Sequence, residues 1–331
     1  MTAHIRFSAA ATVAACLSAM GAGATAAQEY TLRFNHVHSP SEPYQQAFTN
    51  WAERVAERTD GNLVIEVFHS AQLGVEEDII EQMRMGANVG QNTDAARLGN
   101  YVPELAVVNG PYFVDTLEEA FAVGDLGIIK QWEDKLAAET GLKVVCSDFV
   151  QGKRHFFTNG EVRKPEDLSG QRIRTPPAPI WQEAVRALGA EPTAMNYGDI
   201  YPGLQQRAVD GAELTYTNVV AGNFNEVLGY ASETGHILLK NYEVVSAAWF
   251  DGLPEEYQTV LVEECRAAGR EVSQVLADQA EADKQALIDA GMTVIPADDV
   301  DMEAFRKAGR AAYETLGLTD ALEAVYEEMG K

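Results

Sequence analysis

Two arginines lie close together in QRIRTPPAPIW, residues 171–181. QRIRT is typical of a strand, so Arg172 and Arg174 point to the same side, because strand side chains alternate with a period of two. Pro179 suits the first position of a helix, whose free N–H groups and positive dipole end would then lie near the carboxyl end of the strand. An arginine fork there is suited to a carboxylate or phosphate. For Arg174, the pattern alone leaves a ligand contact and a structural ion pair equally open.

A second arginine, Arg154, lies in GKRHFFTNG at the start of a predicted strand. Phe156 and Phe157 would form an apolar wall beside it. Taken alone, this pattern favours a structural role.

His36 and His38 would share one face of a strand, which is the minimum for a pair of metal ligands. No nearby His or Cys completes a tetrahedral set, so we expect no metal site. We expect the two rings to hydrogen-bond backbone groups at a strand end near a cleft. Adjacent carboxylates such as Glu76 and Glu77 are common in so acidic a chain, and most such pairs belong on solvated helix faces.

Signatures of common enzyme classes are missing from the sequence. It contains no G-x-S-x-G, no phosphate loop ending in G-K-[ST], no G-x-G-x-x-G and no H-E-x-x-H. An ordinary exported enzyme is therefore less favoured, and we expect no cofactor.

Strand-like and helix-like patterns alternate along the chain and must position these residues. TLRFNHV, NLVIEVFHS, GLKVVCSDF and QRIRT have strand patterns, and helical patterns separate them. Such alternation predicts an α/β fold with mainly parallel strand pairing. Residues 255–290 contain one glycine and no proline. They are predicted to form a single helix, roughly 54 Å long at 1.5 Å per residue, that packs across two lobes.

The first 27 residues have the pattern of a secretory signal peptide, with an apolar stretch followed by small residues. A less favoured interpretation is a lipoprotein cleavage site before Cys16. Without this segment the chain has 24 Lys and Arg against 50 Asp and Glu, a net charge of −26. That charge disfavours nucleic acid and anionic lipid as partners. We expect a periplasmic protein.

Two cysteines, Cys146 and Cys265, follow the predicted signal peptide. Export permits a disulfide, but nothing in their spacing indicates a disulfide framework. We expect them to stay unpaired. The remaining 304 residues are enough for two domains of about 100 to 200 residues each.

Several segments together resemble one family, the extracytoplasmic solute-binding proteins of tripartite ATP-independent periplasmic (TRAP) transporters of the DctP and sialic-acid-binding type. The segments are LRFNHVHSPSEPY, IEVFHSAQLGVEEDIIEQMRMG, GQRIRTPPAPIWQEAVRALGAEPTAMNYGDIYPGLQQRAVDGAE and FDGLPEEYQ. The resemblance implies a type II-like Venus flytrap fold with two α/β lobes, a hinge cleft and a long helix spanning both. The lobes are expected at residues 28–151 plus 240–279 and 152–239 plus 280–331.

The resemblance also implies a function and a site. The protein would bind a small organic acid as a monomer and deliver it to a membrane permease. Arg174 matches the arginine that pairs with the ligand carboxylate in this family, and Arg154 matches its frequent helper. Five more residues fall where the family lines its cleft: Val37, Glu76, Asp94, Arg97 and Tyr197.

Departures from the family pattern bear on the ligand. The sialic-acid type has Q-E-N-P where this chain has AELT at 212–215, so Leu214 replaces an amide, and Pro177 replaces a second asparagine. An unpaired buried polar group costs about 1 to 3 kcal/mol, so a polyhydroxylated ligand is disfavoured. We expect a monocarboxylate with a partly apolar or aromatic remainder, enclosed by Pro177, Tyr197, Leu214 and Tyr216. An exported ligand-sensing module or an enzyme on the same fold is the alternative.

Overall fold

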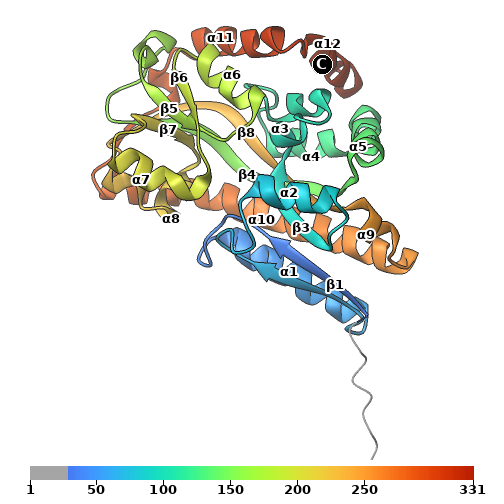
Figure 1. Ribbon diagram of the computed structural model, residues 1–331. Helices are drawn as coiled ribbons and strands as arrows, with labels where there is room; N and C mark the ends of the chain where they lie inside the picture. Colours follow the sequence, from blue (N-terminus) through green and yellow to red (C-terminus); the bar gives the residue numbers. More distant parts are fainter. Residues whose placement is uncertain (1–28) are drawn as a thin grey trace, which may run out of the picture.

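The computed structural model describes residues 29–331, which form one mixed β-sheet flanked by helices (Figure 1). Over these residues the sheet has nine strands in the order β2-β1-β3-β8-β4-β7-β5-β6, and β9 pairs with β8. The strands are β1 (Tyr30–Asn35), β2 (Leu63–Phe68), β3 (Val89–Asp94), β4 (Leu142–Thr158), β5 (Arg172–Thr175), β6 (Glu191–Ala194), β7 (Gly211–Leu214), β8 (Tyr230–Ser246) and β9 (Thr293–Ile295).

Two strands of 17 residues, β4 and β8, run through both halves of the sheet. They pair antiparallel from Leu142 opposite Ser246 to Thr158 opposite Tyr230. Parallel pairs occur within each half, among β1, β2 and β3 and among β5, β6 and β7. The expectation of mainly parallel pairing is therefore wrong at the centre, because the chain crosses between the halves in opposite directions.

Helices cover the sheet and link its halves. They are α1 (Pro43–Arg58), α2 (Glu76–Arg84), α3 (Ala95–Leu98), α4 (Leu117–Asp125), α5 (Gly127–Thr140), α6 (Pro179–Ala187), α7 (Ile200–Gln205), α8 (Tyr216–Ala221), α9 (Ala247–Asp251), α10 (Glu255–Asp289), α11 (Met302–Thr315) and α12 (Thr319–Met329). Short 3₁₀ helices are η1 (Pro103–Asn109), η2 (Pro165–Leu168), η3 (Tyr197–Asp199), η4 (Phe224–Glu226) and η5 (Ala297–Asp299).

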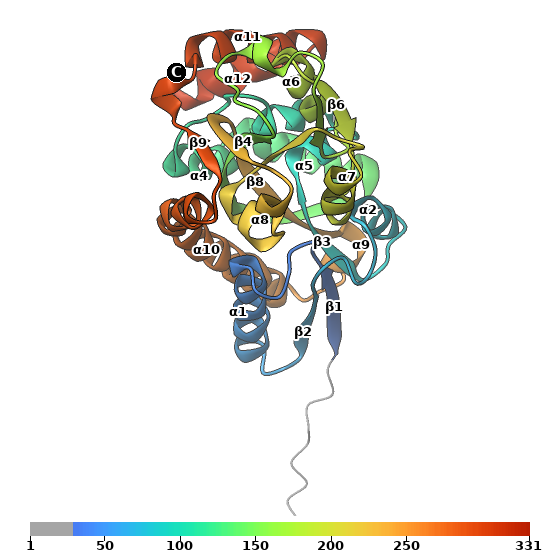
Figure 2. The same cartoon turned by 90° about the vertical axis from the view of Figure 1, so that its left-hand side faces the viewer.

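The predicted long helix is confirmed as α10, which has 35 residues. It runs beneath the sheet from α9 to α8 (Figures 1 and 2). Phe48, Trp51 and Val55 form the buried stripe of α1, which packs on α10. The indole N–H of Trp51 donates to the carbonyl of Leu261 at 3.0 Å and so fixes the contact between the two helices.

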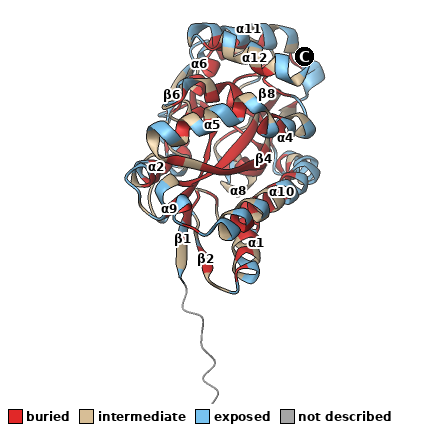
Figure 3. Cartoon of the chain, turned by 90° about the vertical axis from the view of Figure 1, so that its right-hand side faces the viewer, coloured by how far each residue is buried: buried red, intermediate tan, exposed pale blue. Residues whose placement is uncertain are grey.

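Buried residues concentrate on the crossing strands and on the inner faces of the helices (Figure 3). One apolar cluster lies between β1, β2, α1 and α10, and others lie around β5, β7 and α8. Separate clusters in the two halves fit the two-lobed α/β fold, which is confirmed. The expected lobe boundaries fall inside β4, β8 and α10, and they stay a prediction.

Cys146 of β4 and Cys265 of α10 form a disulfide, with Cα atoms 6.0 Å apart. The expectation that they stay unpaired is wrong. The two residues are 119 positions apart and meet only because α10 packs along β4, a contact that sequence spacing does not reveal. Closing a loop of this length contributes about 4 to 5 kcal/mol to stability on the chain-entropy account.

The predicted signal peptide, and the alternative cleavage site before Cys16, lie outside the described residues. Within residues 29–331, no helix combines the length and the apolar character that crossing a membrane requires.

Candidate functional site

A small cavity of about 50 Å³ lies on one face of the crossing strands β4 and β8. Most of the residues predicted to form the site line it, although they come from elements far apart in the sequence. Its lining consists of Val37, His38, Glu76, Asn92, Asp94, Arg97, Gln151, Arg154, Arg174, Pro176, Trp181, Tyr197, Asn218, Leu239 and Asn241.

Arg174 lies at the carboxyl end of β5 and is buried. Pro176 follows it at the cavity wall, and α6 begins at Pro179, as predicted. The Nε of Arg174 donates a hydrogen bond to the carbonyl of Met195 at 2.9 Å. Among residues 29–331, no carboxylate forms an ion pair with its guanidinium. Burial, and then the neighbouring charge of Arg154, lower the pKa of Arg174.

Arg172, two residues earlier on the same strand, has the opposite environment. It is exposed, and its guanidinium pairs with Asp210 at 2.8 Å. Arg174 therefore stands apart as a buried cation with no acid at ion-pair distance among the described residues, although the charges of Glu213 and Glu76 act on it from farther away. Burial without a counter-charge is costly, which makes this side chain a natural anion contact.

Arg154 reaches the cavity from β4 and pairs through Nε with the carboxylate of Glu213. The hydroxyl of Thr175 donates to the other oxygen of Glu213 at 2.9 Å. Burial alone raises the pKa of Glu213, but Arg154 and His236 outweigh it and lower the pKa to about 2. Arg154 also lies 5.5 Å from the centre of the Trp181 ring. It is thus held in place by an acid and an aromatic face.

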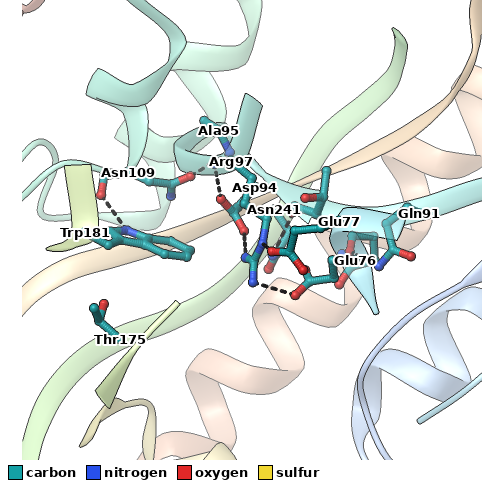
Figure 4. Close-up of polar contacts among 12 residues, drawn as sticks. Glu76, Glu77, Gln91, Asp94, Ala95, Arg97, Asn109, Thr175, Trp181 and Asn241 are labelled. Carbon is teal, nitrogen blue, oxygen red and sulfur yellow. Dashed lines mark hydrogen bonds and ion pairs between the residues drawn. The ribbon is translucent and has the colours of Figure 1, made fainter. Parts of the chain in front are cut away.

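Arg97 has the most crowded surroundings of the three arginines that line the cavity (Figure 4). It contacts Glu76 at 2.7 Å, Glu77 at 2.9 Å, and the carboxylate of Asp94. Asp94 also caps α3 by accepting the backbone N–H of Arg97 at 2.7 Å. These contacts fix the orientation of Glu76 and Asp94 toward the cavity.

Three carboxylates share this single guanidinium, so at least one of them is poorly compensated. Burial, reinforced by Asp94 and Glu77 and opposed by Arg97, raises the pKa of Glu76 to about 7. Burial disfavours the charged form of Arg97, but the three acids outweigh it and raise its pKa further. This end of the cavity is therefore acidic, whereas the Arg174 end is basic.

Neutral polar side chains that the sequence did not indicate also line the cavity. They are Asn92, Gln151, Asn218 and Asn241. Asn92 donates to Glu243 at 2.9 Å, and Asn241 accepts from Tyr44 at 2.9 Å. Asn92 shares a face of β3 with Asp94, so the period of two could have identified it. Asn241 enters through the long-range pairing of β3 with β8, which the sequence does not show.

Three predicted site residues do not line the cavity. Leu214 is fully buried in an apolar cluster, and Tyr216 bonds Glu233 at 3.0 Å on the other side of the strands. Pro177 is half-buried, and its neighbour Pro176 takes the place at the wall. Tyr197 does line it, with its hydroxyl 3.5 Å from the carbonyl of Asn218. Of the four residues expected to enclose the ligand, Pro177, Tyr197, Leu214 and Tyr216, Tyr197 alone lines this cavity.

Phe156 and Phe157 belong to apolar clusters and form no wall beside Arg154 at the cavity. Their side chains are completely buried. The expected aromatic wall is instead supplied by Trp181, which comes from α6.

His36 and His38 bond side chains and not the expected backbone groups. Nε2 of His36 lies 2.8 Å from Gln45, and Nδ1 of His38 lies 3.1 Å from Glu42. Across residues 29–331, no group of three or more His, Cys, Asp or Glu residues could hold a metal ion.

Comparison with known proteins identifies the family. Residues 34–319 match the model of the bacterial extracellular solute-binding protein, family 7. A solute-binding protein from Chromohalobacter salexigens is 30% identical over 276 residues, which cover 83% of this chain and 82% of that protein.

Two solved TRAP periplasmic solute-binding proteins share the fold. One, from Ochrobacterium anthropi with bound L-fuconate, has a TM-score of 0.86 and 27% identity over 91% of this chain and 99% of that one. The other, from Actinobacillus succinogenes with bound L-galactonate, has a TM-score of 0.85 and 29% identity over 91% and 99% of the two chains. The chain therefore belongs to family 7 of the bacterial extracellular solute-binding proteins, the DctP-type binding proteins of TRAP transporters.

Proposed function

We propose that this chain captures a polyhydroxylated monocarboxylate, such as an aldonate or uronate, and delivers it unchanged to a TRAP membrane permease. The observation that carries the proposal is Arg174, a buried cation with no carboxylate partner in residues 29–331. A ligand carboxylate would supply the missing counter-charge through a planar two-pronged contact. Arg154, locked by Glu213, would support the same carboxylate from β4.

The acidic end of the cavity argues against a second anionic group on the ligand. Glu76 and Asp94 line it and share Arg97 with Glu77. A dicarboxylate or a phosphate with another acid would bring like charges together there, and like charges disfavour binding. Hydroxyl groups, in contrast, can donate hydrogen bonds to these carboxylates.

The neutral polar lining favours several hydroxyls on one ligand. Asn92, Asn218, Asn241 and Gln151 offer both donors and acceptors. The expectation of an apolar remainder rested on Pro177, Tyr197, Leu214 and Tyr216, and of these Tyr197 alone lines the cavity. L-Fuconate and L-galactonate, bound by the two solved relatives, are polyhydroxylated monocarboxylates.

Capture requires movement. A cavity of about 50 Å³ is well below the roughly 300 to 1,000 Å³ that is usual for small-molecule sites. A sugar acid therefore enters only if the lobes or the lining side chains move apart, as hinge closure around a ligand allows.

Isothermal titration of the purified protein tests the proposal. L-Galactonate, L-fuconate and D-glucuronate represent sugar acids, whereas succinate, phenylacetate and galactitol test a second charge, an apolar body and a missing carboxylate. We expect binding of at least one sugar acid and none of the other three. Tighter binding of succinate or phenylacetate would overturn the proposed ligand class. NMR of the recovered ligand tests the enzyme alternative, because a solute-binding protein returns it chemically unchanged.

A further inference from the structure

A second and larger cavity, of about 470 Å³, lies on the opposite side of the crossing strands from the first. Gln151, which lies at an irregularity of β4 between Val150 and Gly152, lines both cavities, and the residues after it face the two cavities in alternation. Arg154 lines the first cavity and Lys153 and His155 line the second, while Leu239 lines the first and Leu238 the second. The volume is in the range of about 300 to 1,000 Å³ that is usual for small-molecule sites.

The second cavity forms where α10 passes beside β4, β8 and α8, the elements grouped at the centre of Figure 2. It has an apolar wall and a polar end. The apolar side chains are Leu117, Val150, Leu238, Leu276, Ala277, Ala280 and Met302. Three of these come from one stretch of α10, so the wall is continuous along the helix.

The polar end includes the exposed side chain of Lys153 and the buried imidazole of His155, with Gly235 beside both. Gly235 has a left-handed backbone conformation with φ of +51°, and a Cβ built on it would lie 3.4 Å from Lys153 Cδ and 3.9 Å from His155 Cε1. Its N–H donates to Nδ1 of His155 at 3.0 Å, so the proton of the neutral ring is on Nε2. Burial lowers the pKa of His155 to about 3, which keeps the ring neutral at pH 7.

Lys153 has no ion-pair partner among the described residues. The other two cations of the cavity do have partners. Lys284 pairs with Glu233 at 2.8 Å, and Arg306 pairs with Asp115 at 2.8 Å. Glu281 also lines the cavity and lies 3.9 Å from Lys284, so the lining has three acids and three bases, and Lys153 is the one of these bases with no acid within ion-pair distance in the described residues.

We propose that this cavity is a second ligand site, specific for a small amphiphilic monocarboxylate. Its carboxylate accepts hydrogen bonds from Lys153 and from Nε2 of His155, and its apolar body lies along Leu276, Ala277 and Ala280. The site is separate from the Arg174 cavity and does not depend on the ligand proposed for it.

Octanoate serves as the probe because it combines a carboxylate with an apolar chain. Octylamine has the same chain with a positive charge, and acetate has the carboxylate without the chain, so both serve as controls. Titration calorimetry should show binding of octanoate and not of the other two. Lys153→Met should weaken octanoate binding about tenfold or more, since a hydrogen bond to a charged group contributes about 1.5 to 3 kcal/mol. Lys307→Met removes an exposed ammonium outside the cavity and is the matched control.

Ala280→Trp should fill the cavity and abolish octanoate binding, whereas Ala282→Trp, on an exposed part of α10 outside the lining, should leave it unchanged. Both positions are exposed, so both variants should fold, and circular dichroism checks this. Arg174→Ala should keep octanoate binding. The proposal would be overturned if the wild type did not bind octanoate, or if it bound octylamine as tightly as octanoate. It would also be overturned if octanoate binding persisted in Ala280→Trp or was lost in Arg174→Ala.

Discussion

Arg97 and Arg174 line the same cavity and are both buried, yet their surroundings are opposite. Arg97 lies among three carboxylates, Glu76, Glu77 and Asp94. Arg174 has no acidic partner in the described chain and uses a backbone carbonyl instead. The chain has 50 acidic residues against 25 Lys and Arg. Acids are therefore plentiful, and the lack of an acidic partner for Arg174 among the described residues is a specific property of this cavity.

We infer that the two arginines have different roles: Arg97 positions other side chains, and Arg174 contacts the ligand. Arg97 is satisfied by the protein, so its role is to orient the acids that face the cavity. Arg174 is satisfied only when something else supplies a negative charge. A buried charge that loses its partner costs several kcal/mol, so the two arginines should respond differently to substitution.

Arg97→Ala should give the largest effect, on stability. It leaves Glu76, Glu77 and Asp94 close together with no cation, and breaking a buried ion pair in this way costs about 3 to 5 kcal/mol. Urea unfolding of the apo protein should show the loss. An unfolding free energy within about 1 kcal/mol of wild type would contradict the positioning role.

Arg174→Ala should leave the fold intact and remove binding. The loss of one partner of a buried charge pair costs about 2 to 5 kcal/mol of binding free energy, which calorimetry with the sugar acid would measure. Arg172→Ala, two residues away on the exposed surface, is the control. Unchanged affinity in Arg174→Ala would remove this residue from the site.

Arg174→Lys should have a smaller effect on affinity. The lysine keeps the charge but cannot reproduce the planar two-pronged contact, and a lost charge-assisted hydrogen bond costs about 1.5 to 3 kcal/mol. Full affinity in this variant would mean that charge alone, and not the fork, binds the ligand.

The pH dependence of stability should differ between the two ends of the cavity. Folding raises the pKa of Glu76 from 4.5 to about 7, so the folded state holds more protons in that range. The contribution of Glu76 to the free energy of unfolding is therefore present below about pH 4.5 and is lost as the pH rises through 7. Folding lowers the pKa of Glu213 to about 2, so its contribution is present above pH 4.5 and is lost as the pH falls toward 2.

Glu76→Gln tests this sign. It should flatten the stability profile between about pH 4.5 and 7 by roughly 1 to 3 kcal/mol, since one pKa unit corresponds to about 1.4 kcal/mol. Urea unfolding at a series of pH values provides the measurement, and Glu57→Gln at an exposed position of α1 is the control. A profile identical to wild type would mean that the environment of Glu76 does not shift its titration.

Features encoded locally could be predicted from the sequence. The stretch without proline predicted α10, and the strand, prolines and helix around Arg174 predicted its place at a strand end. Pro179 was expected at the first position of a helix and opens α6. These predictions depended on residues near one another in the chain, where periodicity and capping act directly.

Features made by long-range contacts could not be predicted in the same way. The ion pair of Arg154 with Glu213 depends on β4 pairing with β7, and Asn241 reaches the cavity through the pairing of β8 with β3. The error at Leu214 was avoidable. Glu213 points to Arg154, so the neighbouring residue must point to the other face of β7.

The disulfide between β4 and α10 has a consequence for how the protein is made. Its two cysteines are 119 residues apart, so during synthesis the thiol of Cys146 emerges well before its partner exists. The reducing cytosol does not support the bond, and chain made or retained there lacks the covalent link between a central strand and the long helix. The bond therefore forms only once the chain meets oxidising conditions, and until then the strand and the helix are held together by packing alone.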